Sequence, residues 1–290
     1  MQAFNKKMTS KPCGIFISPK SENFLKGSIS LGLLNVATAV KDIVDVVIVD
    51  LGLKEFNLKN IVKQKKPLFF AITNNYSINF YMIARFIKRL RSEFPNTVII
   101  TGGFHSTFDC ENVVNLGVDY VIKHEGEISF REIVEYIIGD KKRKLNMIKG
   151  IVYKKNNKIH INEGRELAIL DDLPIPDYDL LGKEYKKYYF NKFRVIETSR
   201  GCTYKCNFCS DISMWNFKYR NKSPKRVLKE FIKAKEGGIK FIMVADANMS
   251  NNPENLKEIC NLLIKNKNDI PWFSQHRADR IVKNPNLVKL

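Results

Sequence analysis

The chain has 290 residues, of which 44% are hydrophobic, so it is long enough to bury a core in each of about two domains. No apolar run reaches the roughly 18 residues that span a bilayer, and the basic N-terminus lacks the apolar segment of a signal peptide. The formal net charge of +19 is compatible with a polyanionic partner, but the lysines are spread along the chain without an arginine-rich tract. We therefore expect neither a membrane nor a nucleic-acid partner.

Short apolar segments alternate with helical segments in the first half of the chain. The apolar segments are rich in Val, Ile and Phe and nearly continuous, as is typical of buried parallel strands. Ser77 is suited to cap the helix that carries Ile83, Ile87 and Leu90. This alternation predicts a doubly wound, five-stranded parallel sheet of the flavodoxin or Rossmann type in a domain over residues 10–140. The expected strands are residues 13–18, 45–50, 68–73, 97–101 and 119–123.

Three loops follow the third, fourth and fifth of these strands, at the edge of the sheet where ligands bind in such folds. Paired glycines let the backbone approach a bulky ligand, and Ser, Thr and Asn offer short hydrogen-bonding groups. Taken alone, each loop is more typical of a tight turn than of a binding site. The candidate ligand-binding residues are Thr73, Asn74, Ser77, Gly102, Gly103, His105, Ser106, Thr107, Glu125, Gly126 and Glu127.

Together these loops resemble those of the cobalamin (B12)-binding domain. Residues 102–107 are similar to the family's GG-x-H-x-T segment, and residues 118–127 are similar to its V-D-Y-V-x-x-G-E-G-E segment, with His124 in place of a glycine. The resemblance covers about residues 13–140 and implies that the loops hold cobalamin. The loop at residues 19–27 has no histidine to ligate cobalt, and we interpret His105 as a loop residue rather than a cobalt ligand.

Residues 141–190 are expected to connect two domains. They begin with a basic stretch and continue with a β-hairpin, residues 148–153 and 158–161, whose turn contains two asparagines. Pro174 and Pro176 then favour extended backbone, so the segment is interpreted as a semi-rigid connector.

The connector and a short strand at residues 194–196 are followed by a C-x3-C-x2-C motif formed by Cys202, Cys206 and Cys209. Thiolates are the natural ligands of iron–sulfur clusters. A closed structural site uses four ligands, so three thiolates leave one metal position open, as catalytic sites do. A zinc loop or buried free thiols are the alternatives, although zinc sites usually show paired C-x2-C units. Cysteines grouped as ligands favour a reducing, cytoplasmic location.

The motif follows Arg200 and Gly201 and resembles the signature of the radical S-adenosylmethionine (SAM) superfamily, which lies after the first strand of a (β/α)6 partial barrel. The resemblance implies that the three cysteines hold a [4Fe–4S] cluster whose open iron binds SAM. It also implies that Phe208 lies near the adenine. An external electron donor of the flavodoxin or ferredoxin type is the implied partner.

The remaining sequence continues the β/α alternation over residues 191–290. Ser223 and Asn252, each followed by a proline, predict two helix starts, and strands are expected at 241–245 and 272–275. The resemblance implies that Asp246 and Asn248, at the end of the barrel's second strand, hold the SAM amino group. Gln275 and Arg277 follow the next strand and are further candidates for contact with SAM or substrate. A full barrel would need three more β/α units, so we expect the N-terminal half of a truncated barrel.

The combined resemblance implies a radical SAM enzyme that reductively cleaves SAM and uses cobalamin as a methyl carrier, most specifically a methyltransferase with an unknown substrate. A tRNA methylthiotransferase is an alternative. That family carries three further cluster cysteines in its first domain, where this chain has only Cys13 and Cys110. The other alternative is a non-catalytic cofactor-binding fragment with an iron–sulfur cluster.

Overall fold

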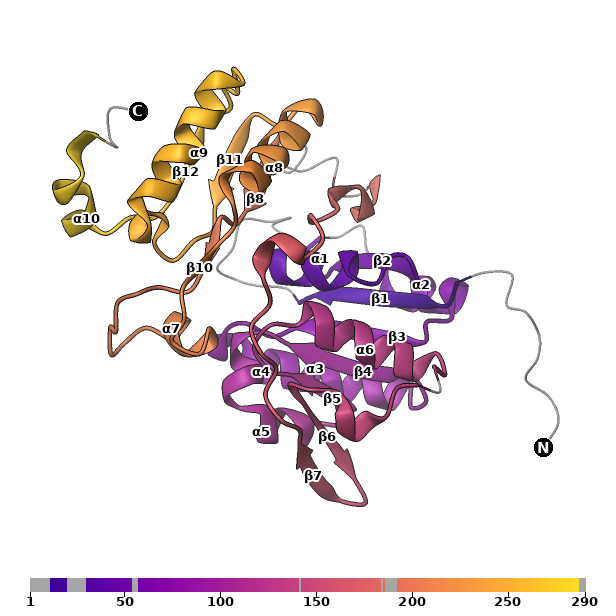
Figure 1. Ribbon diagram of the computed structural model, residues 1–290. Helices are drawn as coiled ribbons and strands as arrows, with labels where there is room; N and C mark the ends of the chain where they lie inside the picture. The colour runs from indigo at the N-terminus through magenta and orange to yellow at the C-terminus, as the bar shows by residue number, and fades with distance from the viewer. Residues whose placement is uncertain are drawn as a thin grey trace. The chain divides into compact units, whose positions relative to one another are not determined.

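The computed structural model describes residues 11–19, 30–53, 57–140, 142–183, 185 and 192–286 (Figure 1). The chain divides into two compact units, Met1–Arg165 with Asp177–Gly182 and Glu166–Pro176 with Lys183–Leu290. Most of the loop noted above for its lack of histidine, residues 20–27, lies outside the described residues. Among the helices that are described, none has the length and apolarity needed to cross a bilayer.

A seven-stranded sheet with the order β2-β1-β3-β4-β5-β6-β7 forms the centre of the first unit. Its first five strands run parallel, which confirms the expected doubly wound sheet. The chain leaves β1 toward β2 on one side and β3 on the other, so a topological switch point lies between β1 and β3. These strands are β1 (Cys13–Ser18), β2 (Asp45–Asp50), β3 (Phe69–Thr73), β4 (Val98–Gly102) and β5 (Tyr120–Ile122).

The hairpin of β6 (Ile151–Lys155) and β7 (Lys158–Ile161) pairs antiparallel with β5 and extends this sheet. Asn156 and Asn157 form its turn with φ values of 51° and 60°, the left-handed conformation that two-residue hairpin turns require. The sequence indicated the hairpin correctly but placed it in the connector. In the structure it covers the edge that β5 would otherwise leave unpaired.

Helices cover both faces of the sheet. The side chains of Ile15 and Ile17 pack with α3 residues such as Ile87, whereas Phe16, between them in sequence, packs against Phe130 of α6. This division follows from the two-residue period of a strand. The helices of the unit are α1 (Leu31–Thr38), α2 (Leu58–Lys65), α3 (Phe80–Glu93), α4 (Phe104–Phe108), α5 (Cys110–Val114) and α6 (Glu127–Ile137).

The face toward α6 is built on three buried aromatic rings. The centroids of Phe16 and Phe69 lie 5.7 Å apart, and those of Phe69 and Phe130 lie 5.6 Å apart, both with edge-to-face geometry. A Cβ atom on Gly14 would lie 2.3 Å from the Phe69 ring. Only glycine therefore leaves room for this ring on the first strand.

The second unit contains a parallel three-stranded sheet with the order β12-β11-β8. Its strands are β8 (Phe193–Ile196), β11 (Phe241–Val244) and β12 (Trp272–Phe273), the last shorter than expected from the sequence. The helices are α7 (Asp211–Met214), α8 (Pro224–Glu236), α9 (Pro253–Lys265) and α10 (Ala278–Lys283). A two-stranded ribbon of β9 (Ser199–Arg200) and β10 (Arg220–Asn221) lies at the cysteine loop.

Both predicted helix starts in this unit are confirmed. The Ser223 hydroxyl accepts a hydrogen bond from the Arg226 amide at 3.2 Å, and Asn252 Oδ1 accepts one from the Asn255 amide at 3.1 Å. Each cap precedes a proline at the first helical position. The helices α8 and α9 bury Phe231 and Ile259 in the core that covers the sheet.

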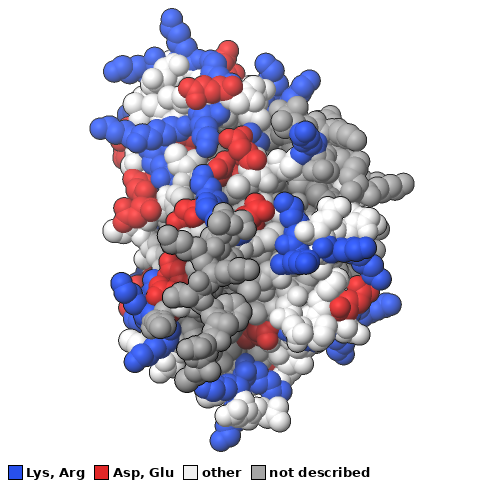
Figure 2. Space-filling model, turned by 90° about the vertical axis from the view of Figure 1, so that its right-hand side faces the viewer, with Lys and Arg blue, Asp and Glu red and all other residues white. Residues whose placement is uncertain are grey.

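Charged side chains of both signs are interspersed on the face that Figure 2 shows. A nucleic-acid surface typically gathers basic residues on one face or along one helix. The expectation of no nucleic-acid partner stays a prediction.

The substitution Phe130→Ala should lower the free energy of unfolding of the first unit by about 3–5 kcal/mol, because it removes a buried ring from the aromatic core. Ile128→Ala on the same helix is the matched control, since Ile128 is 39% exposed and should cost less than about 1 kcal/mol. Urea denaturation of both variants measures the difference. Equal losses would contradict the packing described here.

Candidate functional site

The loops after β3 and β4 meet at the carboxyl edge of the first sheet. The backbone N–H of Asn74 donates to the Gly102 carbonyl at 2.8 Å. The backbone carbonyl of Asn74 accepts from the backbone amides of His105 at 3.1 Å and Ser106 at 3.4 Å. Backbone contacts therefore bring together two of the three loops that the sequence singled out. This edge is where doubly wound sheets bind ligands.

Gly103 permits the two loops to approach this closely. Its φ is 110°, and a Cβ atom there would lie 2.2 Å from Asn75 Oδ1 and 2.9 Å from the Asn74 carbonyl oxygen. The sequence attributed the glycine pair to close approach of a ligand. The structure shows that Gly103 first accommodates the neighbouring loop.

Asn74 is completely buried, and neither the oxygen nor the nitrogen of its side-chain amide has a hydrogen-bond partner. Leaving a buried amide unsatisfied costs about 1–3 kcal/mol, so such a group is rare without a ligand or a water molecule to satisfy it. The unpartnered amide fits a site for a ligand that is rich in polar groups. It is the observation in this unit that points most directly to a bound cofactor.

Ser106 and Thr107 hold the loops in place. The Ser106 hydroxyl lies 2.9 Å from that of Thr101, and the Thr107 hydroxyl donates to the Gly103 carbonyl and accepts from the His124 amide, both at 2.9 Å. His124 has a φ of 60°, so the histidine keeps the left-handed backbone that the glycine of the family motif would adopt easily. The departure from the motif therefore leaves this turn intact.

His105 is held by a hydrogen bond at Nδ1 and by ring packing, and its buried Nε2 has no hydrogen-bond partner among the described residues. Nδ1 lies 2.9 Å from the Ser77 hydroxyl, Nε2 lies 3.5 Å from Asp109, and the ring packs 4.5 Å from that of Phe80. The prediction that Ser77 caps the following helix was wrong, because its hydroxyl binds His105 and a 3-10 turn at Ser77–Asn79 precedes α3. No local pattern indicated this partner, because it lies 28 residues away along the chain.

The loop after β5 packs against α1. Glu125 and Glu127 are buried, and Glu127 accepts a hydrogen bond from the Asn35 side chain at 3.4 Å. A Cβ atom on Gly126 would lie 3.0 Å from Val36 Cγ1. Thr73, at the end of β3, is half-buried at the same edge of the sheet.

In the second unit, the cysteine motif lies on an irregular loop that begins directly after β9. Gly201 enters the loop with a φ of 86°, and a Cβ atom there would lie 2.1 Å from the Lys218 carbonyl oxygen. Cys202, Cys206 and Cys209 are half-buried free thiols. The Cys209 amide donates to the Cys206 carbonyl at 3.1 Å, so the last two cysteines share one tight turn.

The three thiols do not converge on a single point. Within the described residues, no three His, Cys, Asp or Glu side chains lie close enough to bind one metal ion. A [4Fe–4S] cluster attaches each cysteine to a different iron atom, so it does not require such convergence. Three reduced, partly accessible thiols on one loop therefore fit a cluster better than a single zinc ion.

Asp246 anchors the start of the cysteine loop. Its carboxylate is buried and accepts hydrogen bonds from the Thr198 amide at 2.7 Å, the Thr198 hydroxyl at 2.5 Å and the Ser199 hydroxyl at 2.6 Å. Burial raises the pKa of Asp246, against the lowering effect of these donors. The side chain thus fastens the end of β11 to the segment that leads into the motif.

Asn248 is also engaged within the protein. Its Oδ1 accepts from the Ser250 hydroxyl at 2.8 Å and from the Arg277 amide at 3.3 Å, and its Nδ2 donates to Asn251 Oδ1 at 3.0 Å. The roles of Asp246 and Asn248 toward SAM stay predictions. In this structure both residues position the loops around the cysteines.

Sequence reasoning missed Asn251. Its Oδ1 accepts from the Thr203 hydroxyl at 2.9 Å and lies 3.9 Å from the Cys202 sulfur, and its buried Nδ2 has no hydrogen-bond partner. This Nδ2 group, beside Cys202, is a hydrogen-bond donor that is available to a polar ligand bound at the cluster. No motif could have indicated it, because its contact with Thr203 spans 48 residues.

A buried group of charges lies next to the loop entrance. Glu197 pairs with Arg200 at 2.7 Å, and Lys222 lies 2.8 Å from Glu230 and 3.8 Å from Glu197. Burial alone would raise the pKa of Glu197, but Arg200 and Lys222 hold it below its usual value. These ion pairs hold the backbone in place at Arg200 and Gly201, where the chain enters the cysteine loop.

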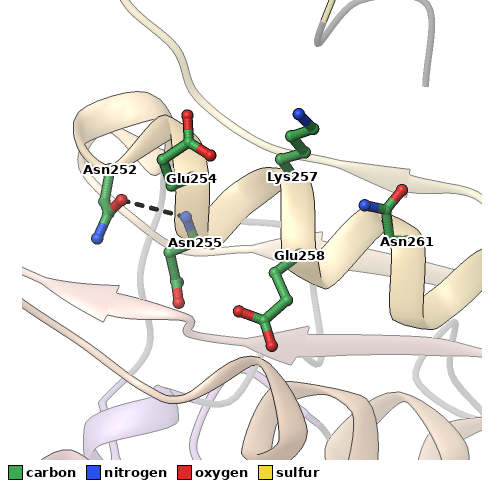
Figure 3. Close-up of a pocket in the computed structure, with 6 residues that line it drawn as sticks. All are labelled: Asn252, Glu254, Asn255, Lys257, Glu258 and Asn261. Carbon is green, nitrogen blue, oxygen red and sulfur yellow. Dashed lines mark hydrogen bonds between the residues drawn. The ribbon is translucent and has the colours of Figure 1, made fainter.

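Phe208 is 88% exposed, so its ring is accessible to a ligand, and its contact with adenine stays a prediction. Figure 3 shows a hollow on one face of α9 that contains no cysteine. The hollow is lined by Asn252, Glu254, Asn255, Lys257, Glu258 and Asn261.

Comparison with known proteins matches both units to families. Residues 26–134 match the B12 binding domain, and residues 196–284 match the radical SAM superfamily. An uncharacterized methyltransferase of Pyrococcus horikoshii is 32% identical over 281 residues, which is 91% of this chain and 60% of that protein. The anaerobic magnesium-protoporphyrin IX monomethyl ester cyclase of a Synechocystis species is 25% identical and matches 72% of this chain and 42% of its own.

Among solved structures, the cobalamin-dependent SAM radical enzyme OxsB, with aqua-cobalamin and SAM bound, superposes with a TM-score of 0.75 over 93% of this chain and 39% of its own. At 20% identity this likeness shows the shared fold. The chain spans 60% or less of each of these three proteins.

The two matched regions and the thiols of the C-x3-C-x2-C loop define a radical SAM protein. More particularly, the chain belongs to the radical SAM proteins that carry a B12-binding domain. The two families imply a [4Fe–4S] cluster, SAM and cobalamin as cofactors.

We expect Asn74→Leu to weaken the retention of cobalamin without lowering the free energy of unfolding of the cofactor-free chain, because the amide that it removes has no partner there. Asn35→Leu is the matched control, since its buried amide is bonded to Glu127 and its loss should destabilise the chain by about 1–3 kcal/mol. Gel filtration after incubation with hydroxocobalamin, together with urea denaturation, measures both effects. Undiminished retention by Asn74→Leu would show that the amide does not face the cofactor.

Proposed function

We propose that this chain acts in a cobalamin-dependent radical SAM methyltransferase. The observation that carries the proposal is the loop of three free thiols at the family spacing, directly after β9, in a chain that also matches the B12-binding domain. The similarity to the Pyrococcus methyltransferase supports methyl transfer as the reaction. The substrate and the donor of electrons are separate partners, and we propose a flavodoxin or ferredoxin type for the donor.

Cys202, Cys206 and Cys209 would hold the cluster, and the loop edge around Asn74 and Gly103 would hold cobalamin. When bound, the cluster supplies the electron that cleaves SAM to a carbon radical, and cobalamin supplies a carrier for methyl groups. The chain's own contribution is positional, because its described residues place thiols, amides and hydroxyls in fixed positions around both sites. Asp246 and Asn248 contribute by fixing the two segments that border the cysteine loop.

Ring formation is a second candidate reaction, favoured by the similarity to the magnesium-protoporphyrin cyclase. Both reactions share cleavage of SAM at the cluster and differ in what happens to the substrate afterwards. A product that gains the isotope of a labelled SAM methyl group identifies a methyltransferase, whereas a cyclised product without the label identifies a cyclase.

The shared step can be tested on the chain itself. After anaerobic reconstitution with iron and sulfide, addition of a reductant and SAM should produce 5′-deoxyadenosine, measured by chromatography. Cys206→Ala should reduce this product by at least about a hundredfold, because it removes a proposed ligand of the cluster, and losing even a residue that only orients a metal ligand commonly costs about 10- to 100-fold. Cys260→Ala, in α9 and outside the motif, is the matched control and should retain the activity.

Failure of the reconstituted, unmodified chain to form 5′-deoxyadenosine would contradict the proposal. Equal product from Cys206→Ala and from the unmodified chain would also contradict it, because the cleavage would then not depend on the motif.

A further inference from the structure

Tyr204 lies inside the cysteine motif, between Cys202 and Cys206, and is fastened to the segment that follows β12. Its hydroxyl donates a hydrogen bond to Asp279 Oδ2 at 2.7 Å. The contact spans 75 residues and links the irregular loop to the first turn of α10. The Tyr204 side chain therefore holds the irregular cysteine loop against α10.

Arg277 completes the attachment. Its guanidinium carbon lies 3.7 Å from the centre of the Tyr204 ring, which is a close cation–π contact, and its Nε donates to Asp279 Oδ1 at 2.9 Å. The Arg277 amide nitrogen also donates to Asn248 Oδ1 at 3.3 Å. We call Tyr204, Asp279 and Arg277 the loop clasp.

The loop clasp directs a cation toward a cluster ligand. Arg277 Nη1 lies 3.9 Å from the Cys206 sulfur, in the geometry of a hydrogen bond donated to sulfur. The neighbour of the Cys202 sulfur, at the same distance of 3.9 Å, is the neutral Asn251 Oδ1, which accepts from the thiol rather than donating to it. Of these two contacts, only the one to Cys206 brings a positively charged group, whose charge the Asp279 carboxylate offsets in part.

We propose that Arg277 is a positioning residue that raises the reduction potential of the cluster, acting through the Cys206 sulfur while the loop clasp holds it in place. Reduction adds one negative charge to the cluster, and a nearby cation with an N–H donor stabilises the more negative state. This inference rests on the proposed function, because it requires a cluster on the three thiols. It assigns to Arg277 a role toward the cluster, in place of the contact with SAM or substrate that the sequence suggested.

The size of the effect is limited by solvent. The Arg277 side chain is 40% exposed, so water and salt screen part of its charge. We expect Arg277→Gln to lower the ratio of reduced to oxidised cluster, at a fixed potential, by about threefold to tenfold. A tenfold change corresponds to about 59 mV for a one-electron couple.

The experiment is a redox titration of the reconstituted chain, followed by electron paramagnetic resonance of the reduced cluster. Arg280→Gln is the matched control. It removes the same charge from α10, where the Arg280 guanidinium lies 5.5 Å from the Tyr204 ring, and should leave the potential close to that of the unmodified chain. Arg277→Lys keeps the charge but loses the planar fork, so its potential should lie between those of the unmodified chain and Arg277→Gln.

Tyr204→Phe tests the loop clasp itself, because it keeps the ring under the guanidinium and removes only the hydrogen bond to Asp279. It should lower the yield of cluster, measured as iron and sulfide per chain, and shift the potential less than Arg277→Gln does.

Two results would overturn the inference. Equal shifts of the reduction potential in Arg277→Gln and Arg280→Gln would show that the overall surface charge, rather than the contact of Arg277 with Cys206, sets the potential. An unchanged potential in Arg277→Gln, with weaker binding of SAM, would assign the guanidinium to SAM instead. If the unmodified chain assembles no cluster at all, both the proposed function and this inference fail. If a cluster forms and its potential is the same in Arg277→Gln, only this inference fails.

Discussion

The second unit depends on one buried carboxylate. Asp246 lies two residues beyond the end of the strand β11 and accepts three hydrogen bonds from Thr198 and Ser199, which lead into the cysteine loop. Burying a carboxylate without partners is strongly unfavourable, so the buried position of Asp246 depends on the hydrogen bonds from Thr198 and Ser199. The contact spans 48 residues and joins two neighbouring parallel strands just beyond their carboxyl ends. The register of the sheet therefore sets where the cysteine loop begins, and contacts within the loop and the loop clasp position the thiols that follow.

The first unit reaches a similar result with backbone groups. The Asn74 carbonyl accepts two amide hydrogen bonds from the loop after β4, and Gly103 provides the space for that contact. The motif residue Thr107 connects the loops after β4 and β5, and Ser106, beside it, bonds to Thr101 of β4. In both units the candidate binding groups lie on loops, and the strands beneath them supply the rigidity. Conserving such a site would require keeping the supporting contacts as well as the groups that face the ligand.

The sequence was sufficient for features that depend on local pattern. Continuous apolar runs predicted β1 and β2 with the bounds that the structure shows, and Ser223-Pro224 and Asn252-Pro253 predicted two helix starts. Local pattern could not predict the partner of a side chain. Ser77 has the residue type of a helix cap, but its hydroxyl is hydrogen-bonded to His105, 28 residues away along the chain. The loop clasp and Asn251 were missed for the same reason, and the hairpin was found without its place in the sheet.

If the cofactor satisfies the amide of Asn74, as proposed above, its binding links the supply of cofactor to the stability of the folded chain. A ligand that binds only the folded state stabilises it in proportion to the logarithm of its concentration, and a ligand that also satisfies a buried amide removes a cost that the empty chain carries. On that proposal, copies that lack the cofactor would unfold more often than loaded copies. Because proteases act on unfolded and partly open chains, degradation would select against empty copies in a cell that is short of cofactor. The fold would in this way adjust the amount of protein to the amount of cofactor without a separate regulator.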